Sequence, residues 1–153
     1  MNRLRRDLVA GGSGALLAAL LGAPAASQVA AARDQNPFQA RSPAAVYAAL
    51  GLAAPAATTA IVITAPDIAE NGANVRVEVE AKLPDVTRIL LVAERNIFPL
   101  LADARISSRA LPWIEAKIRL AETSNLRAVV EAGGRLYTAT RHIKVIVGGC
   151  LPG

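Results

Sequence analysis

Apolar and polar residues alternate along much of the chain from Ile61 onward, and this alternation predicts β-strands. Between residues 75 and 82, valine or alanine occupies every second position and a charged residue fills each position between them. A period of two is typical of a strand with one buried face. The same alternation recurs at residues 114–120, and the apolar runs at 61–65 and 87–93 predict two further strands.

The last part of the sequence predicts a hairpin. Residues 126–131 and 136–147 flank the pair Gly133 and Gly134, which is typical of a tight turn. The alternation changes phase near Arg141 and His142, and this change predicts a β-bulge. The segment from Asn96 to Ser108, which contains Pro99, is predicted to be a loop, and Asn71-Gly72 is a strong turn signal.

A short helix is predicted before the strands. Ser42 suits an N-cap and Pro43 the first helical position, and the helix is expected to end near Gly51. The apolar stripe of this helix comprises Val46, Tyr47 and Leu50. Residues 53–59, with Pro55, are predicted to be a linker. Roughly five to seven short strands without interleaved helices then indicate an all-β fold, an antiparallel β-sandwich, with a small barrel as the alternative.

The first 26 residues have the pattern of an export signal. A basic segment is followed by an apolar stretch at residues 8–21 and by small residues up to Ala26. The apolar stretch is shorter and richer in glycine than the ~20 apolar residues that a membrane anchor needs. Arg5 and Arg6 resemble a twin-arginine signal, so we expect export by that route to the periplasm.

Cleavage near Ala26 changes the charge and sets the domain boundaries. The net charge falls from +5 to +3, and the remaining arginines are scattered singly, so neither nucleic acid nor a membrane is an expected partner. We predict four segments: a signal peptide at 1–26, a leader with the short helix and linker at 27–59, the sandwich at 60–147 and a C-terminal arm at 148–153.

The composition excludes most catalytic sites. The chain of 153 residues has one cysteine and one histidine, which rules out an intrachain disulfide and a tetrahedral zinc site. Aromatic residues make up 3% of it, too few for stacking platforms that bind single-stranded nucleic acid. His142 is predicted to be a strand-surface or partly buried histidine rather than a metal ligand, and Trp113 is predicted to pack in the core or an interface. We therefore expect no catalytic residues, no metal and no cofactor.

Cys150 is the residue that points to chemistry. It follows Gly148 and Gly149 and is the fourth residue from the end of the sequence, on a tether of about 10 Å from Val147. This arrangement predicts a flexible arm that presents the thiol to another protein. Three alternatives remain: a buried structural cysteine, a C-terminal prenylation box, which the export signal disfavours, and an intermolecular disulfide.

Several motifs together resemble the SoxY family, the sulfur-carrying subunit of the bacterial Sox thiosulfate-oxidation system. The matching segments lie between about residue 61 and Cys150: Thr64-Ala65-Pro66-Asp67-Ile68-Ala69-Glu70-Asn71-Gly72, Leu83-Pro84-Asp85-Val86, Arg95-Asn96 with Pro99-Leu100, Arg119-Leu120-Ala121-Glu122-Thr123-Ser124, Leu136-Tyr137-Thr138-Ala139-Thr140, and the terminal Gly-Gly-Cys.

The resemblance implies an immunoglobulin-like sandwich that forms a heterodimer with a SoxZ-like subunit. It also implies a carrier rather than an enzyme, which binds thiosulfate-derived intermediates covalently on Cys150 and presents them to Sox enzymes. The family tail is typically Gly-Gly-Cys-Gly-Gly, whereas this chain continues with Leu151-Pro152-Gly153, which is bulkier and stiffer.

An ordinary cysteine thiol has a pKa near 8.5, so a few per cent is thiolate at neutral pH. We therefore hypothesise that partner enzymes, and not the carrier domain, tune the reactivity of Cys150. The rival interpretation is a periplasmic scaffold subunit whose cysteine has no covalent sulfur chemistry.

Overall fold

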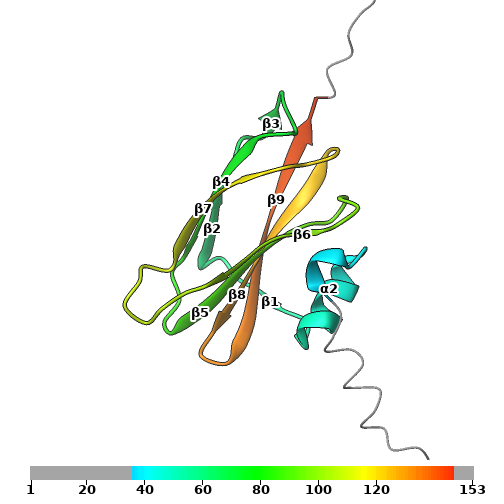
Figure 1. The fold of residues 1–153 in the computed structure, drawn as a ribbon. Helices are drawn as coiled ribbons and strands as arrows, with labels where there is room; N and C mark the ends of the chain where they lie inside the picture. The colour runs from blue at the N-terminus through cyan, green and yellow to red at the C-terminus, as the bar shows by residue number, and fades with distance from the viewer. Residues whose placement is uncertain (1–35, 147–153) are drawn as a thin grey trace, which may run out of the picture.

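The computed structural model describes residues 36–146, which form two β-sheets packed face to face with one short α-helix outside them (Figure 1). The elements in chain order are the 3₁₀ turn η1 (Pro37–Gln39), α2 (Pro43–Leu50), β1 (Ala56–Ala57), β2 (Ile61–Thr64), β3 (Ile68–Ala69), β4 (Val75–Ala81), β5 (Val86–Ala93), β6 (Leu100–Arg105), β7 (Trp113–Ile118), β8 (Ser124–Ala132) and β9 (Arg135–Val145). Within the described residues, no helix is long and apolar enough to span a bilayer.

The larger sheet has the strand order β1-β9-β8-β5-β6, with β3 also paired to β9, and the smaller sheet has the order β2-β4-β7. All pairs are antiparallel except those that β1 and β3 make with β9. Two separate sheets exclude the barrel, so the predicted immunoglobulin-like antiparallel β-sandwich with a short N-terminal helix is confirmed. The predicted C-terminal arm lies outside the described residues.

The main core lies between the two sheets. The inward valines Val75, Val77 and Val79 of β4 are at most 2% exposed and pack with Ile89 and Leu91 of β5. These valines are the residues whose alternation predicted the strand. Aliphatic side chains form nearly all of this core, as expected from the low aromatic content.

A second apolar cluster lies on the outer face of the larger sheet, beneath α2. Val46 of the helix packs there against Leu90 and Val92 of β5 and Val129 of β8. Strand β5 is therefore buried on both faces, which explains why its sequence is an apolar run without alternation.

The helix has the ends that the sequence predicts. Ser42 Oγ accepts a hydrogen bond from the backbone N–H of Ala45 at 3.1 Å, and Pro43 occupies the first turn. Gly51 follows the helix with φ of +65°, a conformation that favours glycine. Ser42 and Gly51 therefore set the two ends of α2, and the helix between them covers the outer apolar cluster.

Two segments predicted to be irregular are in fact strands. Residues 96–108 contain β6, which pairs with β5, and residues 53–59 contain β1, which pairs with Tyr137 and Thr138 of β9. Both are strands at the margin of the larger sheet, where hydrogen bonds to one neighbour set the extended conformation. An edge strand does not need the alternating apolar pattern that identifies a half-buried one.

The β-bulge predicted near Arg141 and His142 is wrong. The pairing of β8 with β9 runs without a shift from Ala132 opposite Arg135 to Ser124 opposite Ile143. Arg141 occupies a position of β9 whose side chain points toward the core, and its long side chain carries the guanidinium to the edge of the sheet. There Nη2 donates to Asp67 Oδ1 at 2.7 Å, so the ion pair accommodates a charged residue at an inward position without a bulge.

Candidate functional site

The predicted attachment residue Cys150 and its tether, Gly148 and Gly149, lie outside the described residues. The structure does describe the end of the sandwich where β9 finishes, which we call the arm end (Figure 1). The loops after β3, β5 and β7 meet there, because Ile143 of β9 pairs with Ser124 at the start of β8. The chain therefore leaves the sandwich between three loops.

The end of β9 is held on both sides. On one side, the N–H groups of Lys144 and Ile146 donate to the carbonyls of Asp67 and Ala69, both at 2.9 Å. On the other side, Thr123 Oγ1 accepts from the N–H of Val145 at 3.0 Å. The arm thus starts from a fixed point on a rigid sheet.

The turn at Asn71-Gly72 closes one side of the arm end. Asn71 Oδ1 accepts from the N–H of Ala73 at 2.9 Å, and the carbonyl of Gly72 accepts from the N–H of Leu120 at 2.7 Å. A Cβ atom at position 72 would meet the Leu120 carbonyl oxygen at 2.4 Å and Val145 Cγ1 at 2.8 Å. Glycine is required there because the backbone passes so close to the Leu120 carbonyl and to the Val145 side chain of β9.

Two hollows flank the last residues of β9. The larger, about 440 Å³, is an open groove that we call the His142 groove. Its lining comprises Glu94, Arg95, Glu122, Thr123, Ser124, Asn125, His142 and Val145. The smaller hollow, about 230 Å³, lies on the other side, between the turn at Gly72 and Leu120, and Val145 lines both.

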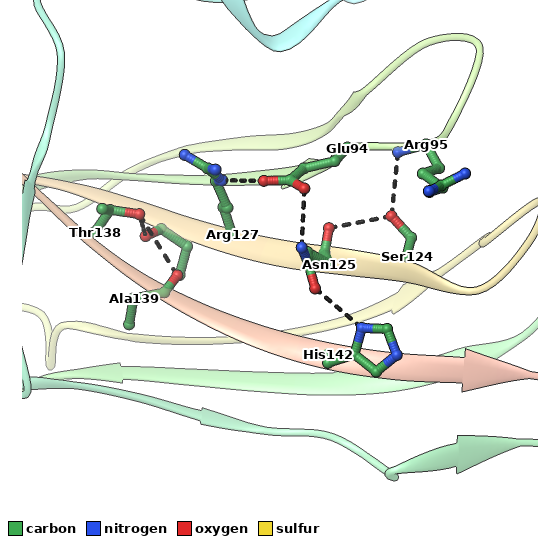
Figure 2. Close-up of polar contacts among 9 residues, drawn as sticks. Glu94, Arg95, Ser124, Asn125, Arg127, Thr138, Ala139 and His142 are labelled. Atoms are coloured by element: carbon green, nitrogen blue, oxygen red, sulfur yellow. Dashed lines mark hydrogen bonds and ion pairs between the residues drawn. The ribbon is translucent and has the colours of Figure 1, made fainter.

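A hydrogen-bonded chain of four side chains lies in and beside the His142 groove (Figure 2). His142 Nδ1 lies 3.0 Å from Asn125 Oδ1, and Asn125 Nδ2 donates to Glu94 Oε2 at 3.0 Å. The other oxygen of Glu94 accepts from Nε of Arg127. The groups come from β9, β8 and the residue after β5, so the larger sheet itself brings them together.

Glu94 is the acidic residue in this series of hydrogen-bonded side chains, and it accepts from both Asn125 and Arg127. Its partial burial by itself raises the carboxyl pKa, but the hydrogen bonds from Asn125 and Arg127 and the charges of Arg127 and Arg95 outweigh burial. The pKa of Glu94 therefore lies below its ordinary value, and the carboxylate is ionised at neutral pH.

Replacing Glu94 by Gln is expected to reduce stability at neutral pH and to leave it unchanged in acid. A depressed folded-state pKa contributes stability that is present above the ordinary carboxyl pKa and is lost as the pH falls through the folded-state value. The melting temperatures of wild type and variant should differ at pH 7 and converge below about pH 4. Glu70→Gln, at an exposed turn, is the control, and a constant difference at all pH values would contradict the assignment.

The structure decides two further sequence predictions. His142 is exposed on the surface of β9, which confirms the strand-surface prediction. Trp113 begins β7 and is 47% exposed, so it does not pack in the core. Among residues 36–146, no three His, Cys, Asp or Glu side chains gather closely enough to hold a metal ion.

Sequence reasoning missed Glu94, Asn125 and Arg127. Each stands in a different segment, and no spacing along the chain links them to His142. The one available signal is polarity: Asn125 and Arg127 interrupt the apolar run of β8 on its outer face, the face on which Val129 packs beneath α2.

The fold and the site define a small β-sandwich protein whose last strand lines a polar groove and is followed in the sequence by a segment with a single cysteine. A family model described as sulfur oxidation protein SoxY matches residues 46–150, and this chain belongs to the SoxY family.

The solved structures that resemble the chain include a sulfur carrier protein and a superoxide reductase. The sulfur carrier protein SoxY from Chlorobium limicola f thiosulfatophilum is 41% identical, with a TM-score of 0.61, covering 67% of this chain and 89% of that one. A superoxide reductase (neelaredoxin) from Ignicoccus hospitalis is 20% identical, with a TM-score of 0.50, covering 58% of this chain and 82% of that one. This second likeness concerns the fold alone. Among curated protein sequences, none matches this chain.

Proposed function

We propose that this protein is a periplasmic sulfur carrier that holds thiosulfate-derived intermediates covalently on Cys150. The observation that carries the proposal is the extent of the family match, which runs through the sandwich to residue 150 and so includes the cysteine. The Chlorobium relative, 41% identical, is a sulfur carrier protein. The arm end supports this role, because a strand held on both sides gives the arm a fixed origin.

The proposed attachment is an S–S bond between Cys150 Sγ and the terminal sulfur of thiosulfate. The thiol proton is released, and forming this bond from thiolate and thiosulfate removes two electrons. A redox-active Sox enzyme must accept those electrons, because the part of the chain that the structure describes has no group that can do so. The protein is then a substrate-bearing carrier, and catalysis belongs to its partners.

The proposed partners are a SoxZ-like subunit, with which the chain forms a heterodimer, and the Sox enzymes that act on the bound sulfur. Gly148 and Gly149 let the backbone turn freely next to the thiol. Export by the twin-arginine route is proposed from Arg5 and Arg6, and it places the carrier in the periplasm.

The test is the intact mass of the protein purified from the exported fraction, measured before and after reduction. Sulfur or thiosulfonate increments that map to Cys150 and disappear with reductant are the expected result. An unmodified thiol, or a plain disulfide dimer, after exposure to thiosulfate and the partner enzymes would contradict the carrier function.

A further inference from the structure

Strand β7 is an edge of the smaller sheet, and it is the edge best suited to pair with a strand of another molecule. It pairs with β4 over six residues, Trp113–Ile118, without a register shift. The other edges are shorter or irregular: β1 and β3 have two residues each, β2 has four and ends just before Pro66, and the pairing of β6 with β5 contains a register shift. Long, regular edge strands are open to pairing with another chain, and short or irregular ones resist it.

The backbone of β7 has hydrogen-bonding groups that face away from β4. The N–H of Ala81 donates to the carbonyl of Pro112 at 2.9 Å, so Pro112 belongs to a hydrogen-bonded pair of the ladder. Such pairs alternate along an antiparallel strand, so every second residue after Pro112 also bonds to β4. The N–H and carbonyl groups of Glu115 and Lys117 therefore point to the open side of the sheet.

The core is also less well covered beneath β7 than beneath β4. The inward valines of β4 are at most 2% exposed, whereas Ile114 and Ala116, which lie opposite two of them, are half-buried. A strand added at this edge would cover these two apolar side chains. Removing apolar surface from water favours such an addition.

The outer face of β7 has one charge that the smaller sheet does not neutralise. Glu115 lies opposite Glu78, and Arg76 compensates both, at 2.9 Å from Glu115 and 3.2 Å from Glu78. Lys117 lies opposite Arg76, another cation, and among residues 36–146 no carboxylate forms an ion pair with it. Like charges directly opposite each other are unfavourable, so a carboxylate on the open side would be stabilising.

A second copy of β7 supplies that carboxylate in one register. Two identical strands related by a two-fold axis pair antiparallel, and outward residues must lie opposite outward residues. With Ala116 at the axis, each Lys117 faces Glu115 of the other copy. On the inner side, each Ile114 then faces Ile118 of the other copy. An axis at Glu115 would oppose two glutamates and an axis at Lys117 two lysines, so charge complementarity selects the register centred on Ala116.

We propose that two copies of this chain pair through β7, antiparallel and centred on Ala116, so that two three-stranded sheets become one sheet of six strands. Trp113, which is 47% exposed, then faces Arg119 of the other copy, and a guanidinium beside an indole ring is a favourable contact. The exposed indole thereby gains an interface. This inference goes beyond the proposed function and uses neither Cys150 nor any residue after β9.

The experiment measures the mass of the exported protein by sedimentation velocity over a range of concentrations, with reductant present to exclude a disulfide dimer. Wild type is expected to dimerise at the higher concentrations, and added salt should weaken the dimer. Glu115→Lys and Lys117→Glu are each expected to weaken it about tenfold or more, because each change makes two attractive pairs repulsive. Lys82→Glu, an exposed charge reversal just after β4, is the matched control and should leave the dimer unchanged.

Mixing the two variants gives the sharper test. The Glu115→Lys chain has two positive charges along the β7 edge and the Lys117→Glu chain has two negative ones. An equal mixture should therefore form a mixed dimer with about the wild-type affinity, which also shows that both variants are folded. A monomeric wild type, a dimer that neither variant weakens, or a mixture that stays monomeric would overturn the proposal.

A SoxZ-like subunit is the rival occupant of this edge, and hydrogen exchange distinguishes it from a second copy. In the chain alone, exchange at the amides of Glu115 and Lys117 should slow as the protein concentration rises. If exchange slows only after a SoxZ-like subunit is added, the pairing of two copies is wrong. The carrier function is judged separately, by the adduct mass on Cys150, so either proposal can fail while the other stands.

Discussion

Cys150→Ser is expected to abolish sulfur loading and all thiosulfate-dependent turnover while partner binding is retained. A serine hydroxyl forms no S–S bond and stays protonated at physiological pH, so the variant has no atom on which an intermediate can be held. The loss should be complete and not graded, because the chain has a single cysteine. The measurements are the adduct mass and the rate of thiosulfate oxidation with purified partner enzymes.

The variant should fold normally. Position 150 follows β9, whose last residue is Val145, and the buried residues described for the two cores lie between positions 46 and 143. Ser108→Ala, an exposed change in the loop before β7, is the control for handling and should behave as wild type. Co-purification with the SoxZ-like subunit should be unchanged for both variants.

The same variant separates the carrier from its rivals. A scaffold subunit would retain full turnover and partner binding after Cys150→Ser. A protein whose cysteine forms an intermolecular disulfide alone would lose the covalent dimer and nothing else. Retained turnover would therefore remove the carrier interpretation even though the family assignment stands.

Strands with one buried face could be predicted from the sequence alone. The valines of β4 lie in register with the inward residues of β7, and their burial repeats every second residue. The helix was predictable for a different reason, since Ser42, Pro43 and Gly51 specify its two ends locally. Both signals depend on residues that are neighbours in the chain.

Features that depend on distant segments could not be predicted. Arg141 interrupts the apolar alternation of β9. A charged residue is accommodated there because it pairs with Asp67, which stands 74 residues earlier in the sequence. The series of hydrogen bonds that begins at His142 likewise links side chains of β8 with the residue after β5. These positions become neighbours only in the folded sheet. The cysteine-bearing arm, in contrast, stays a prediction: it rests on glycines and a thiol that are consecutive in the sequence, and it lies outside the described residues.

Strand β6 is another element that the sequence did not predict. It contains the residue whose replacement is expected to reduce stability most. Asp103 in the middle of β6 looks like a loop residue in the sequence, but it forms a two-point ion pair with Arg88 of β5. Arg88 Nε donates to Oδ1 at 2.7 Å and Nη2 to Oδ2 at 2.5 Å. The Arg88 side chain is 7% exposed and that of Asp103 is 19% exposed. The hydrogen bonds to Asp103 raise the pKa of Arg88 despite its burial, so the guanidinium is charged in the folded state.

Asp103→Ala is expected to destabilise the protein by about 3 kcal/mol, because it leaves the charge of Arg88 buried without its principal partner. Such a loss lowers the melting temperature by more than about 10 °C in a domain of this size. The matched control is Glu115→Ala, which removes an exposed ion pair with Arg76 and should cost less than about 1 kcal/mol.

The double variant Arg88→Met with Asp103→Leu tests whether the cost comes from the unpaired charge or from the lost pair itself. Replacing both partners by apolar side chains of similar size removes the burial of charge together with the ion pair, so stability should return to near the wild-type value. Glu131, opposite Arg88 on β8, then faces a neutral side chain, which limits the recovery. If the double variant is as unstable as Asp103→Ala, the pair itself contributes the stability, and β6 depends on it to remain in the sheet.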